Sequence, residues 1–190
     1  SGVTERMQYN RFTIGCPVNR RSIARSLATG TLVFLCLQTP LWAGPAVVIQ
    51  IKGDVERRLP DSSDWTAVEV GDRLPEGTVV RTGKKSDLDL DIDSGHRLHV
   101  VSDTQLVLSA LQDKKTKTFL TKGKVLSKVR PLKDQEKFLI QTPSAVCAVR
   151  GTEFWAGANE QGTAVQVQHG LVGMQGPKGG QEMMVHAGEI

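Results

Sequence analysis

Short stretches in which apolar and polar residues alternate dominate the chain from Val47 onward. The clearest stretch covers residues 87–93, where Leu88, Leu90 and Ile92 alternate with four aspartates. Because successive side chains of a strand point to opposite faces, this order gives one apolar and one acidic face. Similar pairs of apolar residues occur at Val47 and Ile49, Leu98 and Val100, Leu106 and Leu108, Phe138 and Ile140, and Val165 and Val167. Glycine or proline separates them at intervals of roughly ten residues, a spacing typical of all-β domains.

The sequence predicts the presence of these strands more clearly than it predicts how they are arranged in space. No strict internal repeat is present, so periodicity alone does not establish a solenoid. A β-sandwich or a barrel is also compatible with short strands at this spacing. The residues therefore predict an all-β domain and leave its architecture open.

The segment from Ile140 to Phe154 holds the longest apolar run of the body. Five apolar residues, 145–149, lie between Thr142-Pro143 and Arg150-Gly151. A continuous run between turn residues predicts a strand buried on both faces. Cys147 lies inside this run, so we expect a small core residue and not a reactive thiol. Gly151 permits a tight turn after the strand.

The same segment resembles the signature of the FecR domain family. The resemblance rests on Thr142-Pro143 followed by Ala148-Val149-Arg150-Gly151-Thr152-Glu153-Phe154, and it covers most of residues 47–190. Further matching positions are Gly53-Asp54-Val55, Trp65, Gly71-Asp72, Leu74, Gly77, Val80-Arg81-Thr82-Gly83, 88–92, Ser94-Gly95, Gly123-Lys124-Val125, 165–172 and Ala187-Gly188-Glu189.

The resemblance implies a small right-handed β-helix or solenoid-like stack of short strands. It also implies an exported, non-catalytic domain for protein interaction and signal sensing in the Gram-negative envelope. Family members of the founding type are membrane-anchored sigma-factor regulators with a cytoplasmic amino-terminal segment. Only roughly 20–40 residues precede the apolar stretch of this chain, too few for such a folded domain. We therefore expect an interaction module over a direct sigma-factor regulator, and such a module can form part of a longer envelope protein.

The first 43 residues have the composition of an export leader. They hold five arginines and one acidic residue, whereas residues 44–190 hold 19 basic and 19 acidic residues. Arg20, Arg21 and Arg25 precede the apolar stretch 27–37, and a small residue, Ala43, offers a cleavage site. Residues 1–43 are thus predicted to be a signal peptide or an uncleaved membrane anchor, and 44–190 a periplasmic or otherwise exported domain. The body's balanced charge gives no reason to expect nucleic-acid binding.

Two sets of residues are candidates for binding a partner. Between residues 113 and 137 there are nine basic and three acidic residues, an excess that suits an acidic partner, an anionic lipid or a cell-wall polymer. The lysines proposed for this patch are Lys114, Lys115, Lys117, Lys122 and Lys124. The alternative is a solvated patch paired with the body's own acids. The second set is Arg150, Gly151 and Thr152, for which a structural role is preferred. The Arg150 guanidinium is expected to clamp turn carbonyls or a carboxylate, with binding of a partner carboxylate as the alternative.

Other chemistry-bearing residues do not form a catalytic pattern. Asp87, Asp89, Asp91 and Asp93 are expected to form a solvated face, with calcium binding as the alternative. His96, His99, His169 and His186 lack metal-site spacing and are expected to be structural or on the surface. Trp65 and Trp155 sit beside apolar residues and are predicted to be in the core. We expect no enzyme, metal or cofactor. The alternatives are a cell-wall glycan-binding protein and a polysaccharide-acting enzyme.

Overall fold

A computed structural model of the chain describes residues 46–92, 95–112 and 114–189, and their regular structure consists of β-strands. The strands are β1 (Ala46–Lys52), β2 (Val55–Arg58), β3 (Thr66–Ala67), β4 (Arg73–Leu74), β5 (Val79–Thr82), β6 (Asp87–Ile92), β7 (His96–Val100), β8 (Gln105–Gln112), β9 (Lys115–Lys128), β10 (Lys137–Gln141), β11 (Val146–Val149), β12 (Glu153–Asn159), β13 (Gly162–His169), β14 (Leu171–Gln175) and β15 (Met183–His186). The prediction of an all-β domain is confirmed.

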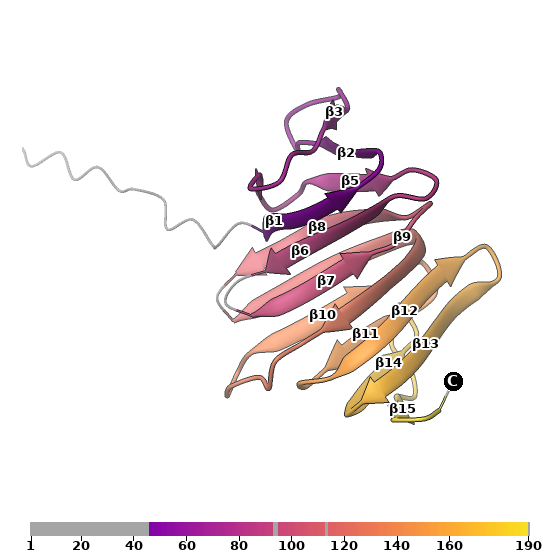
Figure 1. The fold of residues 1–190 in the computed structure, drawn as a ribbon. Coiled ribbons are helices and arrows are strands. Elements are labelled where there is room, and N and C mark those ends of the chain that lie inside the picture. The colour runs from indigo at the N-terminus through magenta and orange to yellow at the C-terminus, as the bar shows by residue number, and fades with distance from the viewer. Residues whose placement is uncertain (1–45, 93–94, 113, 190) are drawn as a thin grey trace, which may run out of the picture. The chain divides into compact units, whose positions relative to one another are not determined.

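The strands pair into two sheets that share one long strand, β9. Sheet A has the order β4-β1-β6-β7-β9-β12-β13. Sheet B has the order β3-β2-β5-β8-β9-β10-β11-β14-β15. Residues 115–122 of β9 pair within sheet B, and residues 123–128 pair within sheet A. Figure 1 shows the strands stacked roughly in chain order, from β1 to β15.

Strand β9 passes from one sheet to the other at Gly123. This residue has φ +97°, a left-handed conformation that side chains other than glycine rarely adopt. A Cβ atom here would collide with Thr104, because the Thr104 side chain occupies that space. The Thr104 hydroxyl accepts a hydrogen bond from the backbone N–H of Lys124 at 3.0 Å. The bend is thus fixed by a glycine and a buried threonine packed against it.

The core lies between the two sheets and follows the alternation of the sequence. Leu88, Leu90 and Ile92 of β6 are fully buried, and the described aspartates between them are half-buried on the outer side. Phe138 of sheet B and Phe154 of sheet A belong to the same buried cluster. This burial of one face of each strand is the main source of stabilisation, since apolar area removed from water contributes about 25 cal/mol per Å².

The apolar run 145–149 is a strand, but it is not buried on both faces as predicted. In β11, Cys147 and Val149 are buried, Val146 is half-buried and Ala148 is exposed. The run reads as continuous because the outward positions carry valine and alanine instead of charged residues. Cys147 is fully buried, which confirms its assignment to the core.

The two sheets do not close within the described residues, so they form no barrel. All strand pairs except β9–β10 are antiparallel. The predicted leader, 1–43, and the start of the body at residue 44 lie outside the described residues. Among the residues that are described, no helix has the length and apolar character needed to cross a membrane.

Candidate functional site: a groove on the outer face of sheet B

A groove of about 750 Å³ runs across the outer face of sheet B between β10 and β15. Its floor is a row of residues that are direct cross-strand partners: Leu139 of β10, Ala148 of β11, Gly173 of β14 and Met184 of β15. The two central positions are small, and the flanking positions are apolar. A hollow therefore forms over β11, because Ala148 cannot fill it, whereas the Glu182 side chain covers Gly173 of β14.

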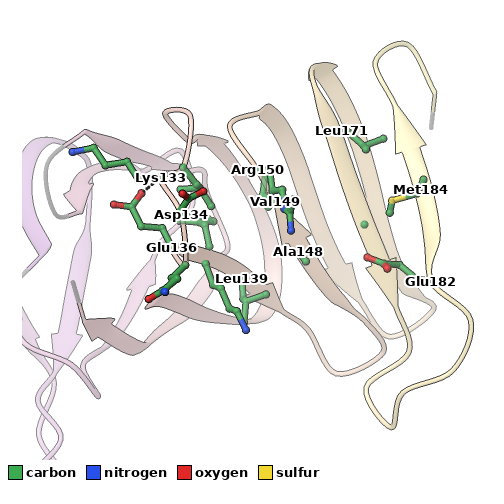
Figure 2. Close-up of a pocket in the computed structure, with 15 residues that line it drawn as sticks. Lys133, Asp134, Glu136, Leu139, Ala148, Val149, Arg150, Leu171, Glu182 and Met184 are labelled. Atoms are coloured by element: carbon green, nitrogen blue, oxygen red, sulfur yellow. Dashed lines mark hydrogen bonds between the residues drawn. The ribbon is translucent and has the colours of Figure 1, made fainter. Parts of the chain in front are cut away.

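Two walls enclose this floor. On one side lies the loop 131–136, and on the other lie Leu171 of β14 and the residues Glu182 and Met184 (Figure 2). The Glu182 side chain lies over Gly173, in the space that a Cβ atom at that position would occupy. Met184 and Leu171 are 48% and 38% exposed, so this wall presents apolar surface to the solvent.

The loop wall is held by an internal ion pair. The Arg130 guanidinium donates two hydrogen bonds to Glu136, at 2.9 and 3.1 Å, and the backbone N–H of Lys133 donates a third at 2.8 Å. These hydrogen bonds, with that from Arg130 first, lower the pKa of the Glu136 carboxyl group from 4.5 to about 2. Leu132 packs against the core from the same loop. Hydrogen bonds and apolar packing within the chain therefore brace this wall.

Arg150 lies in the groove between the two walls (Figure 2). It directly follows Val149, which pairs with Phe138 of β10 and Val172 of β14. The next position along these ladders places Arg150 between Lys137 and Leu171 on the outer face. The side chain is exposed, and no carboxylate of the described residues lies within ion-pair distance of it. A clamp onto a carboxylate is therefore not observed among the described residues, and the partner-carboxylate alternative stays a prediction.

The other two signature residues build the corner between β11 and β12. Gly151 has φ +79°, and a Cβ atom there would lie 2.7 Å from the Cα atom of Pro131. Thr152 is buried, its carbonyl accepts a hydrogen bond from Val129 N–H at 2.9 Å, and its methyl group packs against Gly170. In this geometry Gly151 and Thr152 shape the backbone that carries Arg150.

The five predicted lysines do not form one patch, because β9 changes sheets at Gly123. Lys115 pairs with Lys137 of β10, and Lys117 pairs with Leu139 of the groove floor. Lys114 donates to the Gln135 side chain of the loop wall at 3.3 Å. These three lysines therefore extend the groove's basic side. Lys122 lies near the end of the sheet B segment of β9, and Lys124 belongs to sheet A, where its ammonium lies 4.5 Å from the Trp155 ring centroid.

The structure brings together two candidate sets that the sequence analysis treated separately. Lys115, Lys137 and Arg150 stand at successive positions across β9, β10 and β11. Lys137 and Leu171 were not predicted as site residues. The alternating pattern places both residues on the outer face of their strands. Their closeness to Arg150 can be predicted only once the order of the strands in the sheet is known. The arrangement can bind an extended segment with apolar side chains and carboxylates, since Arg150 presents a planar fork of donors.

Both tryptophans lie on outer faces, so the prediction that they are core residues is wrong. Trp65 is half-buried beneath two arginines, with the guanidinium carbons of Arg81 and Arg58 at 4.0 and 5.1 Å from its ring centroid. Trp155 is half-buried on the outer face of sheet A. For Trp155 the apolar sequence neighbours misled the prediction, because Phe154 and Ala156 point to the core and Trp155 points to the opposite face of β12.

The remaining predicted residues lie away from the groove. Asp89 pairs with His99 at 2.5 Å, and Asp87 lies 4.0 Å from Lys52, so the acidic face is partly neutralised by its neighbours. His96 is buried against Phe138 with ring centroids 5.3 Å apart, whereas His169 and His186 are exposed. Asp93 lies outside the described residues. Among those described, no group of three or more metal-ligating side chains is placed to hold an ion.

Comparisons with known proteins identify one matching family and two structures with a similar fold. The family model described as FecR protein matches residues 78–173, half of the chain. Two crystal structures of a putative anti-sigma factor from Parabacteroides distasonis share the fold at 17% identity, with TM-scores of 0.51 and 0.50. The match covers 57% of this chain and 51% of those chains, so the chain spans about half of their length. No match was found among curated proteins. From the extent of the family match, the chain belongs to the FecR protein family.

Proposed function

We propose that residues 44–190 form a non-catalytic, extracytoplasmic interaction module that takes part in envelope signalling or assembly. Family membership supports a regulatory role, and the likeness in fold to a putative anti-sigma factor agrees with it. The partner is an envelope protein or a cell-wall component, and the chain acts by binding it. The architecture in this proposal is a solenoid-like stack, supported by a chain that passes repeatedly between sheets A and B.

The observation that carries the proposal is the groove with Arg150. Its floor is small and apolar, the Arg130–Glu136 ion pair braces one wall, and its basic side is formed by Lys115, Lys137 and Arg150. Such a surface fits an extended protein segment that bears a carboxylate opposite Arg150. A bidentate arginine–carboxylate pair in a partly covered groove supplies orientation as well as attraction.

Site-specific photo-crosslinking in envelope extract tests this function. A photoreactive residue placed at Ala148 in the groove floor is expected to capture a discrete partner. The same residue placed at Ala67, an exposed position of β3 at the far edge of sheet B, is the matched control and is expected to capture none. Capture at both positions to the same extent would mean that the groove has no special role.

The role of Arg150 is tested in the same assay. Arg150→Glu is expected to abolish capture at Ala148, because it places two carboxylates together where the pair should form. Arg150→Lys keeps the charge but loses the fork, and should weaken capture by about tenfold, the value of one charge-assisted hydrogen bond. Equal capture by the wild type and Arg150→Glu would refute the carboxylate contact.

A further inference from the structure

The outer face of sheet A carries a second, separate site. Cross-strand pairing aligns one residue from each of six neighbouring strands: Gln50 of β1, Asp89 of β6, His99 of β7, Leu126 of β9, Trp155 of β12 and Gln166 of β13. Four of these six side chains can form hydrogen bonds, and the other two positions of the strip hold the aliphatic Leu126 and the aromatic Trp155. The parallel row beside it contains Asp91, Arg97, Lys128 and Glu153, also direct partners, and Asp91 and Arg97 do not form an ion pair with each other.

A small hollow of about 230 Å³ lies over this strip. It is lined by Ile49, Asp89, Arg97, His99, Leu126, Lys128 and Glu153. This volume lies below the roughly 300–1,000 Å³ typical of pockets for drug-sized ligands. It therefore suits one small ring of a longer molecule that continues along the open strip.

Some polar side chains of the hollow already have a hydrogen-bond or ion-pair partner within the chain, and others do not. The His99 Nδ1 atom is 2.5 Å from Asp89, so Nε2 is the ring nitrogen that remains available to a ligand. Lys128 is 3.8 Å from Glu153, a loose contact of a side chain that is 69% exposed. Arg97 is exposed, and no carboxylate of the described residues lies within ion-pair distance of its guanidinium. The fork of Arg97, next to the Lys128 ammonium, is thus open to an external carboxylate.

The aromatic side chain completes the site. Trp155 stands next to Leu126 on the neighbouring strand, and the ring of His99 meets it edge-on with centroids 6.5 Å apart. The flexible, exposed Lys124 side chain covers part of its ring, with the ammonium 4.5 Å from the centroid. Lys124 can move aside at little cost, since no backbone atoms need to shift.

We propose that this site binds a carboxylated sugar within an acidic polysaccharide. The apolar face of the sugar ring lies on Leu126 and beside Trp155. Arg97 and Lys128 hold its carboxylate, and His99 Nε2 accepts a hydrogen bond from one hydroxyl group. A neutral sugar would offer the Arg97 guanidinium no carboxylate to bind. The site faces away from the groove on sheet B and does not depend on it.

Isothermal titration of the purified chain with tetragalacturonate tests the proposal, with cellotetraose as the neutral counterpart. Binding is expected for the acidic tetramer, and binding of cellotetraose is expected to be at least tenfold weaker. Arg97→Gln should lower the affinity for tetragalacturonate by about tenfold or more, the effect of losing a charge-assisted contact. Trp155→Ala should lower it similarly through the lost apolar contact.

Matched variants keep the result interpretable. Trp65→Ala removes the other half-buried tryptophan, which lies under Arg58 and Arg81, and should leave tetragalacturonate binding unchanged. Arg150→Glu should also leave it unchanged, which separates this site from the groove. The exposed Arg97→Gln variant should keep the wild-type thermal midpoint, so it remains informative if Trp155→Ala unfolds. No binding of tetragalacturonate, equal binding of cellotetraose, or full affinity in Arg97→Gln would each overturn the proposal.

Discussion

Replacing Gly151 by alanine tests whether the family signature is a structural corner. Two costs add at this position. The left-handed conformation, φ +79°, costs about 1–2 kcal/mol for a residue with a Cβ atom. The Cβ atom would also lie 2.7 Å from the Cα atom of Pro131, a backbone contact that cannot be relieved by a rotamer change. Overpacking of this kind costs about 1–3 kcal/mol. Gly151→Ala should therefore lower the free energy of unfolding by about 2–5 kcal/mol.

Gly71 provides the matched control for the conformational cost alone. It has a similar φ of +91°, but a Cβ atom there would meet nothing within 4 Å. Gly71→Ala should therefore cost only about 1–2 kcal/mol. Equilibrium urea unfolding measures both variants, and an unchanged slope with denaturant would show that only stability changed. Equal losses for the two variants would refute the close approach of Gly151 to Pro131.

Three further predictions follow from the same structure. Arg150→Lys should change the free energy of unfolding by no more than about 0.5 kcal/mol, as for an exposed side chain. A larger loss of stability would support the internal-clamp hypothesis instead. Burial raises the pKa of the Cys147 thiol from 9.0 to about 11, so the folded state keeps a proton that the unfolded state loses. The free energy of unfolding, measured by urea titration at each pH, should therefore fall as pH rises from 9 towards 11. Cys147→Ala should remove this part of the pH dependence. The pKa of Glu136 is lowered from 4.5 to about 2, so its contribution is present above pH 4.5 and is lost as pH falls towards 2. Glu136→Gln should flatten the acid side of the stability profile, and an unchanged profile would contradict the Arg130–Glu136 pair.

The alternating pattern was sufficient to predict the strands, but not which of them become neighbours. The one-sided burial of β6 could be predicted because its outward residues are all aspartates. The outward positions of β11 hold a valine and an alanine, so the same one-sided burial was hidden in an apolar run. Local composition indicates the exposed face only where that face is charged.

The candidate site required tertiary information that local patterns lack. Arg150 was identified from the signature, but Lys137 and Leu171 flank it only through the order β10-β11-β14. The lysines of β9 appeared as one patch because they are close in sequence. Gly123 sends the two halves of the strand to different sheets, and a single glycine gives no warning of that in the sequence.

The division of β9 between two sheets has a steric consequence. Lys117 in its first half faces the solvent on sheet B, and Leu126 in its second half faces the solvent on sheet A. Molecules docked against these two halves approach from different sides and do not compete for space. If both proposed ligands bind, one copy of the chain can therefore hold them at the same time.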